Sequence, residues 1–325
     1  MTKKIFSTVI FFITPLLFIG AIAQTGTRKP LQTIIIDPGH GGLDPGARGT
    51  FSKESQVSLE VSLKLGKAIE KEFPDIKVIF TRTTDIVPGD KNSIEAGLFY
   101  RADLANESHG DLFIAIHCNS AGRAAGGWYG KRVSGYKTAT KKVKVKKKWV
   151  TKTYKVPIYE TYWIDNRAVG TETYVWAVGK NDAKIKSLTK NNDYTGEIDS
   201  VTNISLPDPS DPAEKARMLI YAQNFFRKSL TLADMVQQEF SKTGRVDRGV
   251  KQRNDKGIWV LQATGMPSVL VEIGFISNKD EEQYINSEKG QDEIVANIFN
   301  AIRSYKEKLE AKKTVADKDA EKKPF

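Results

Sequence analysis

Short apolar runs that alternate with amphipathic stretches constrain the fold of this chain more than any other feature. Residues 34–36 form a continuous apolar run, and residues 112–117 and 268–275 are mainly apolar, which is typical of strands buried on both faces of a sheet. Residues 55–73 instead place apolar side chains at steps of four, as an amphipathic helix does. The alternation predicts the α/β fold class: a single domain with a twisted, mostly parallel sheet flanked by helices.

The two ends of the chain depart from this pattern. Residues 1–23 combine two lysines, an apolar core and a small-residue cleavage motif, which predicts a signal peptide and export to the periplasm or cell envelope. A retained membrane anchor is the alternative, because the apolar run reaches about 18 residues, the lower limit for a spanning helix. Residues 309–325 are charged and poor in apolar side chains, so we expect a disordered tail after a folded domain at 31–308.

Two insertions interrupt the rhythm of strands and helices, at about 122–170 and 181–227. We expect both to lie over the edge of the sheet that carries the active site. The first contains a lysine cluster at 137–155 in which valine and threonine alternate with other residues, and this pattern predicts a solvated β-ribbon. The alternative is that the lysines attract an anionic polymer, in keeping with the formal net charge of +11.

The only cysteine, Cys118, excludes an internal disulfide, so the fold must depend on core burial or on a metal. Cys118 follows His117, which suggests a pair of metal ligands. Neighbouring residues of a strand face opposite sides, however. We therefore interpret Cys118 as a small buried apolar residue.

Acid–base side chains follow three of the predicted strands. His40 comes directly after the first strand, His117 ends the second, and Glu272 lies near the end of the third. Ligands bind at the carboxyl ends of parallel strands, so we expect these residues to converge there. Glu272 is the most informative, because burying a carboxylate costs several kcal/mol unless it is paired, hydrogen-bonded or bound to a metal. The alternative for Glu272 is a structural salt bridge.

A catalytic zinc site has three protein ligands and one open position. Two of these ligands are supplied by His40 and His117. The candidates for the third are Asp37, Asp44, Glu54 and Glu272. If Glu54 is the third ligand, Glu272 remains free as the general acid and base. The glycine-rich loop around His40 lacks the spacing and the lysine of phosphate-binding loops, so we expect no nucleotide there.

These segments together resemble the zinc-dependent N-acetylmuramoyl-L-alanine amidases, the bacterial cell-wall amidase family with a catalytic glutamate. The resemblance extends from residue 31 to about residue 305 in several separate motifs. They read IIIDPGHGGLDPGARG, SKESQVSLEVSLKL, VIFTRTTD, RADLANESHGDLFIAIHCNSA, GTETYVW and MPSVLVEIGFISNKDEEQYI. The similarity implies that residues 31–308 form an amidase catalytic domain.

The resemblance implies that His40, Glu54 and His117 bind one Zn2+ and that Glu272 is the catalytic carboxylate. The expected reaction is hydrolysis, by zinc-activated water, of the amide bond between N-acetylmuramic acid and L-alanine in peptidoglycan. Two alternatives stay open: another zinc peptidase or amidohydrolase acting on cell-wall peptides, and a degenerate cell-wall-binding protein. A weaker expectation is that Asp44 or Asn119 orients His40 or His117.

The expected partners follow from the same resemblance. Peptidoglycan is the substrate, and a protein activator is an open second partner. We expect no nucleic-acid partner, because the chain is exported, and no membrane contact after signal cleavage. Some members of the family carry an inserted helix that plugs the zinc site with an acidic side chain, for which Glu197 and Glu214 are the candidates in the insertion at 181–227.

Overall fold

A computed structural model describes residues 29–177, 184, 212–254 and 257–321. The predicted signal peptide, the retained-anchor alternative and Glu197 lie outside the described residues. Glu214 falls in the first turn of a helix, but its side chain is likewise outside the description. No helix in the described part of the chain is long and apolar enough to cross a membrane.

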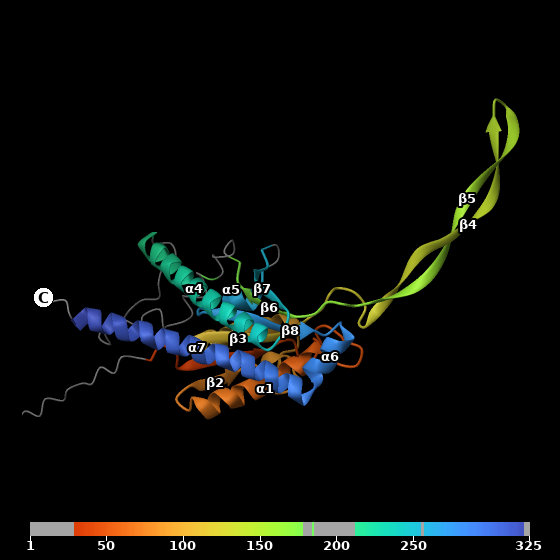
Figure 1. Cartoon of the computed structure of the whole chain (residues 1–325). Helices are drawn as coiled ribbons and strands as arrows, with labels where there is room; N and C mark the ends of the chain where they lie inside the picture. Colours follow the sequence, from red (N-terminus) through yellow and green to blue (C-terminus); the bar gives the residue numbers. More distant parts are fainter. Residues whose placement is uncertain (1–28, 178–183, 185–211, 255–256, 322–325) are drawn as a thin grey trace, which may run out of the picture.

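The described residues form a six-stranded sheet with the order β2-β1-β3-β8-β6-β7 (Figure 1). Its strands are β1 (Thr33–Pro38), β2 (Lys77–Phe80), β3 (Leu112–Asn119), β6 (Thr171–Val175), β7 (Asp247–Gln252) and β8 (Ser268–Phe275). All neighbouring strands pair in parallel except β6 and β8. The predicted fold class, a mostly parallel sheet in an α/β domain, is therefore confirmed.

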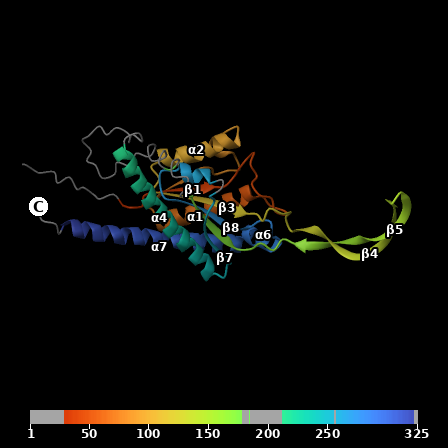
Figure 2. The ribbon, with the colours of Figure 1, turned by 90° about the horizontal axis from the view of Figure 1, so that it is seen from above.

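Helices cover both faces of the sheet. They are α1 (Glu54–Glu72), α2 (Ile94–Glu107), α4 (Pro212–Lys242), α5 (Trp259–Ala263), α6 (Lys279–Asn286) and α7 (Glu288–Glu321), with a 3-10 turn η1 at Pro88–Asp90. Alternation along β1 sends Ile34 and Ile36 into a core shared with α1, α4 and α7, while Ile35 faces the smaller core that holds α2 and α5. In Figure 2, α2 and α7 lie on opposite sides of the sheet.

The C-terminal helix corrects one expectation. The sequence predicts disorder for residues 309–325, but α7 continues to Glu321. The segment after Leu309 consists mainly of good helix formers, and extending an existing helix costs far less than starting a new one. An ion pair between Lys306 and Glu310, with Nζ and Oε1 2.7 Å apart, bridges the point where the apolar pattern ends.

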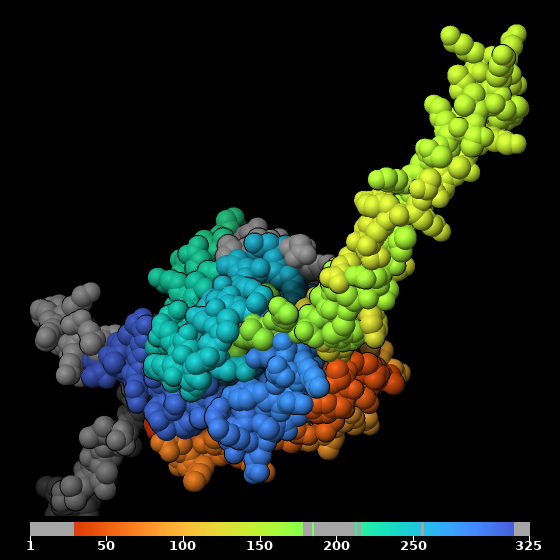
Figure 3. Space-filling model, turned by 45° about the vertical axis from the view of Figure 1, so that its right-hand side comes forward, coloured from red at the N-terminus to blue at the C-terminus, as the bar shows by residue number. Residues whose placement is uncertain are grey.

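The first insertion is a long two-stranded ribbon, β4 (Gly127–Val145) paired with β5 (Lys148–Asp165). It leaves the carboxyl edge of the sheet, as expected, but it projects away from the domain instead of folding over that edge (Figures 1 and 3). The ribbon has no continuous apolar face that could pack against the domain. We call β4, β5 and their connecting turn the arm.

Candidate functional site

The loop after β1 holds His40 beside the end of β3. His40 has a left-handed backbone, with φ of 59°. A side chain at Gly39 would place its Cβ 2.5 Å from Cε1 of His117, so only glycine allows the loop to pass this ring. Gly46 (φ 64°) likewise allows the loop to pass close to two side chains, because a Cβ there would lie 2.6 Å from Oε2 of Glu54 and 2.6 Å from Cδ2 of His40.

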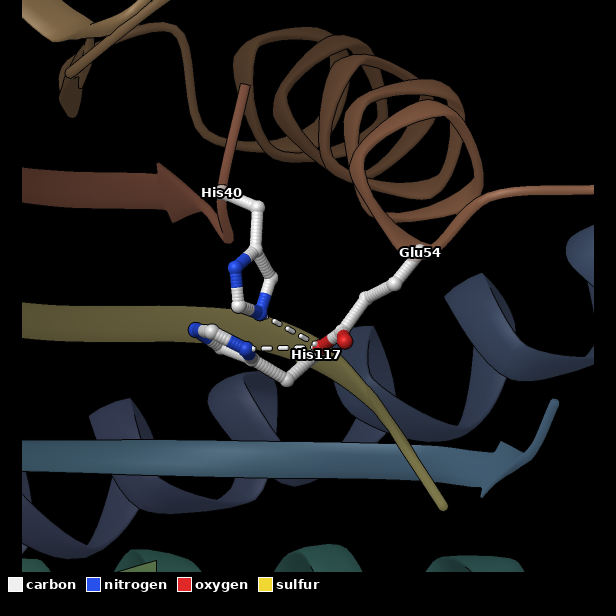
Figure 4. A group of neighbouring side chains, drawn as sticks. All are labelled: His40, Glu54 and His117. Carbon is white, nitrogen blue, oxygen red and sulfur yellow. Dashed lines mark hydrogen bonds and ion pairs between the residues drawn. The ribbon is translucent and has the colours of Figure 1, made fainter. Parts of the chain in front are cut away.

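Glu54 is the first residue of α1, and its side chain reaches both imidazoles (Figure 4). Its Oε1 lies 3.0 Å from Nε2 of His40 and 2.8 Å from Nδ1 of His117. The carboxylate also accepts backbone N–H bonds from Ala47 at 2.8 Å and from Cys118 at 3.0 Å. One ligand atom from each of His40, Glu54 and His117 falls within 4.8 Å of the others, an arrangement that could hold a metal ion.

The charges of this cluster are tightly coupled. Burial opposes ionisation of Glu54, but hydrogen bonds from His117 and His40 outweigh it and hold its pKa well below the usual range. Burial also opposes a charge on His40, yet the carboxylates of Glu54 and Asp44 raise its pKa to about 9. Two acidic groups therefore favour a positive charge on His40. A divalent cation at this position would also place a positive charge beside the two carboxylates. The two nitrogens and one oxygen of this cluster are a donor set that zinc uses.

Asp44 fixes the orientation of His40. Its Oδ2 lies 2.7 Å from Nδ1 of His40, so this nitrogen donates the hydrogen bond and Nε2 faces Glu54. Asn119, the other candidate for this role, instead donates to Oε2 of Glu172 at 2.9 Å. The expectation for Asp44 thus agrees with the geometry, whereas Asn119 uses its amide NH2 on Glu172 and its Oδ1 on the N–H of Ser120, and among the described residues it bonds neither histidine.

Glu272 lies on β8 directly opposite His117 of β3. Its side chain is buried, and Oε2 has no hydrogen-bond partner in the described part of the chain. Burial, followed by the negative charge of Glu54, raises its pKa to about 8. Near neutral pH Glu272 can therefore both accept and donate a proton, which a salt-bridged carboxylate cannot do.

A pocket of about 380 Å³ joins these groups. Its polar lining includes His40, Glu54, His117 and Glu272. Apolar walls come from η1, α2 and α5 and include Leu98 and Trp259. Such a mixture of apolar walls and a few convergent polar groups is typical of a binding site for a small part of a substrate.

Sequence reasoning missed the two arginines beneath the His40 loop. Arg82 donates to the carbonyls of Gly39 at 2.7 Å and of Ser55 at 2.6 Å. Arg101 donates to the carbonyl of His40 at 2.6 Å and pairs with Asp37. Asp37, one candidate for the third ligand, therefore forms an ion pair with Arg101 instead. Both arginines lie in motifs quoted above, but their carbonyl partners are 27 to 61 residues away.

Glu172 on β6 is a second buried carboxylate that sequence reasoning did not single out. It is opposite Glu272 in the sheet register. It accepts from Arg248 at 2.6 Å and from Lys251 at 2.7 Å, and Tyr174 donates to it at 2.7 Å. Glu172 is therefore neutralised by cations, in contrast to Glu272.

The fold and the site define a class: an α/β domain with a His–Glu–His cluster that could hold a metal ion and a buried carboxylate at the carboxyl edge of its sheet. The sequence profile of the N-acetylmuramoyl-L-alanine amidases matches residues 34–304, and the chain belongs to this family. The family predicted from the sequence motifs is thus confirmed.

The individual relatives that the chain matches are consistent with membership of this family. The chain is 27% identical over 289 residues to the N-acetylmuramoyl-L-alanine amidase AmiC of Escherichia coli O6:H1, and the match covers 87% of this chain and 54% of that protein. It is 25% identical over 277 residues to an uncharacterized cell wall amidase of Bacillus anthracis, covering 85% of this chain and 36% of that one. The chain therefore spans about half or less of these two relatives. A putative amidase of Buchnera aphidicola from Acyrthosiphon pisum is matched over 94% of its length at 24% identity, which covers 84% of this chain.

Solved structures share the fold. An N-acetylmuramoyl-L-alanine amidase from Clostridium difficile 630 is similar with a TM-score of 0.50 and 24% identity, over 85% of this chain and 97% of that one. The CwlD amidase from Clostridioides difficile, solved in complex with the GerS lipoprotein, is similar with a TM-score of 0.51 and 21% identity, over 84% and 98% of the two chains.

Proposed function

We propose that this protein is a peptidoglycan hydrolase that uses zinc to cleave the amide bond between N-acetylmuramic acid and L-alanine. One observation carries the proposal: Oε1 of Glu54 contacts the imidazoles of both His40 and His117, and the pocket they line also contains the buried carboxylate of Glu272. Membership of the amidase family supports the substrate and the bond.

The metal ligands in this proposal are His40, Glu54 and His117. A zinc ion held by them would supply Lewis acidity, polarising the amide carbonyl and lowering the pKa of a water molecule toward neutrality. Asp44 keeps His40 in the tautomer that leaves Nε2 available. Arg82 and Arg101 hold the carbonyls of the same loop and so limit its movement.

Glu272 is the general base and then the general acid. Its raised pKa, about 8, lets it take the proton of the attacking water and return it to the nitrogen of L-alanine as the amide bond breaks. Burial serves this exchange, because a carboxylate in water would hold the proton too weakly to deliver it.

Mass spectrometry of muropeptides after digestion tests the reaction. We expect glycan strands that retain the lactyl group and stem peptides that begin with L-alanine. A chelator should abolish both products, and added zinc should restore them. Cleavage within the stem peptide would instead establish the zinc peptidase alternative, and binding without any cleavage would establish the degenerate wall-binding protein.

Substitution of Glu272 separates chemistry from metal binding. Glu272→Gln should retain zinc but lose hydrolysis by a factor of about 10² to 10⁴, the usual contribution of a general acid–base group. Glu70→Gln, the same change at an exposed position on α1, is the control and should remain active. Full activity in the Glu272 variant would remove this residue from the mechanism.

We also propose that the protein acts outside the cytoplasm, in the periplasm or cell envelope, because its substrate is there and the first 23 residues have the form of a signal peptide. A protein partner is part of this proposal, since the similar CwlD amidase was solved with the GerS lipoprotein. Fractionation of cells, with an antibody to the chain, tests the location. Purification of the native protein under mild conditions tests the partner.

A further inference from the structure

The arm concentrates most of the net positive charge of the molecule. Residues 137–155 contain nine lysines and no acidic residue, so this segment accounts for nine of the eleven net positive charges of the chain. The rest of the chain is close to neutral. A charge density of this kind attracts polyanions.

The lysines occupy both faces of the arm. The register pairs Lys141 with Lys152 on one face, and it places Lys142, Lys144 and Lys155 on the other. Like charges directly opposite each other destabilise a ribbon. A membrane surface could contact only one face, and on the face that carries Val143 and Val150 the apolar side chains are interrupted by the pair Lys141 and Lys152. A polymer mesh can surround the arm and neutralise both.

The tip of the arm retains lysine where the backbone disfavours it. Lys146 and Lys147 form the two-residue turn, with φ of 46° and 68°. Asparagine and glycine suit such turns, whereas other residues in the left-handed region cost roughly 1–2 kcal/mol each. The turn thus keeps its charge against the conformational preference of the backbone.

Exposed aromatic rings accompany the lysines. Trp149 and Tyr154 are 68% and 50% exposed near the tip. Toward the base, Tyr129 is 73% exposed and packs edge to face with Trp163, with ring centroids 5.1 Å apart. Flat apolar rings with polar edges suit the apolar faces of sugars. A ribbon of two strands without a packed face is also marginally stable by itself, so a bound partner would stabilise the arm.

The base of the arm adjoins the candidate active site. The strand β3, which carries His117, leads into it through a short loop, and Gly126 donates to the carbonyl of Ser277 at 2.9 Å just after β8. Asn166, at the other end of the arm, donates to the carbonyl of Gly126 at 3.1 Å. The loop that leads from β3 to the arm also contributes Ser120 to the lining of the pocket, so the arm and the pocket adjoin the same edge of the sheet.

We propose that the arm binds intact peptidoglycan: its lysines pair with stem-peptide carboxylates, and its rings pack on the glycan. This inference rests on the proposed function for the identity of the polymer. Because the arm and the pocket belong to one chain, binding by the arm raises the effective concentration of scissile bonds at the site. The arm should therefore matter for insoluble wall and not for small soluble fragments.

Co-sedimentation with purified sacculi tests the arm in the Glu272→Gln background, which leaves the polymer uncut. In the shortened variant, residues 138–155 are replaced by Asn-Gly, which closes the ladder across Lys137 and Val156. Sacculus affinity should fall at least about tenfold. Binding of the intact arm should also weaken at high salt and on sacculi whose carboxylates have been amidated. Equal binding by the shortened variant, or undiminished binding to amidated sacculi, overturns the proposal.

A double substitution at the tip tests the charge of the arm without shortening the ribbon. Lys146→Asn with Lys147→Gly removes two charges but improves the turn, so thermal stability should hold or rise while sacculus binding weakens several-fold. Lys67→Gln with Lys71→Gln removes two exposed charges from α1 and should leave binding unchanged. Loss of binding in this control to the same extent overturns a specific role for the arm.

Two further measurements separate this inference from its alternatives. Tighter binding to anionic phospholipid vesicles than to sacculi overturns the proposal in favour of a membrane partner. With active enzyme, the shortened variant should cleave soluble muropeptides at the normal rate and sacculi more slowly. If the intact enzyme cleaves neither, the proposed function fails, whereas the binding result for the arm stands on its own.

Discussion

Glu282 accepts hydrogen bonds from the loop that precedes Glu54 and so stabilises it. Replacement of Glu282 by glutamine should therefore destabilise the protein. Its carboxylate is fully buried on α6. One oxygen, Oε1, accepts from the amides of Phe51 and Ser52 at 2.9 and 2.8 Å and from the Ser52 hydroxyl at 2.8 Å. The other, Oε2, accepts from the amide and hydroxyl of Thr50 at 2.7 and 2.5 Å. All of these donors require an acceptor, and glutamine offers only one oxygen.

The loss can be counted from these bonds. In the better orientation of the substituted glutamine, the side-chain amide oxygen keeps the three donors of Phe51 and Ser52, and the NH2 group faces the backbone N–H of Thr50. That N–H loses its hydrogen bond to a charged group, which costs about 1.5–3 kcal/mol, and three bonds to a charged acceptor become neutral, at roughly 0.5–1 kcal/mol each. We expect Glu282→Gln to lower the free energy of unfolding by about 3–6 kcal/mol and the Tm by about 10 °C.

Urea denaturation followed by tryptophan fluorescence measures this loss. The control is Glu307→Gln, an exposed position on α7, which should change stability by less than about 0.5 kcal/mol. Burial opposes ionisation of Glu282, but the donors of residues 50–52 outweigh it and lower its pKa from 4.5. The stabilisation is therefore present above pH 4.5 and is lost as the pH falls through the lower folded-state pKa, so the two stability curves should converge in acid. A loss below about 1 kcal/mol at neutral pH would refute the count.

Three other predictions concern the candidate metal site. Asp44→Ala should weaken zinc affinity about 10–100-fold by equilibrium dialysis, because His40 loses its orienting acceptor; unchanged affinity would exclude that role. Zinc must displace a proton from His40, whose pKa is about 9, so apparent affinity in an indicator competition should rise with pH up to about 9 and level off above it. A flat profile would contradict the coupling of His40 to the acids. Gly46→Ala should abolish tight zinc binding, whereas Gly244→Ala, with a similar positive φ but no atom within 4 Å of the new Cβ, should only lower the Tm. Equal zinc binding by both variants would show that the space at Gly46 is not needed.

The sequence was sufficient to predict the central strands, because they follow from local periodicity. It was also sufficient to predict that His40, His117 and Glu272 lie at one edge of the sheet, because ligand-binding residues gather at the carboxyl ends of parallel strands. It was not sufficient for the third ligand. Reasoning from the residues alone left four carboxylates open, and only the resemblance to the amidases indicated Glu54. The pairing of Asp37 with Arg101, 64 residues later, is seen only in the structure. Contacts between residues so far apart leave no periodic signal in the chain.

Two further elements could not be predicted from hydrophobicity alone. The strand β7 reads DRGVKQ and lies at the edge of the sheet, half exposed, so it lacks the apolar run by which buried strands are recognised. The C-terminal part of α7 has few apolar residues, and there helix propensity and continuity with the preceding turns decided the outcome. Low hydrophobicity indicates exposure, and exposure is compatible with either a coil or a helix.

The solitary cysteine has a practical consequence. Cys118 is buried on β3, and burial raises the pKa of its thiol well above the usual value, so it reacts poorly with maleimides while the protein is folded. A second cysteine introduced at an exposed position would then be the only site of attachment for a fluorophore. The native chain can thus carry a single optical reporter without prior removal of a thiol, and the orientation of β4 and β5 relative to the domain can be followed when sacculi are added.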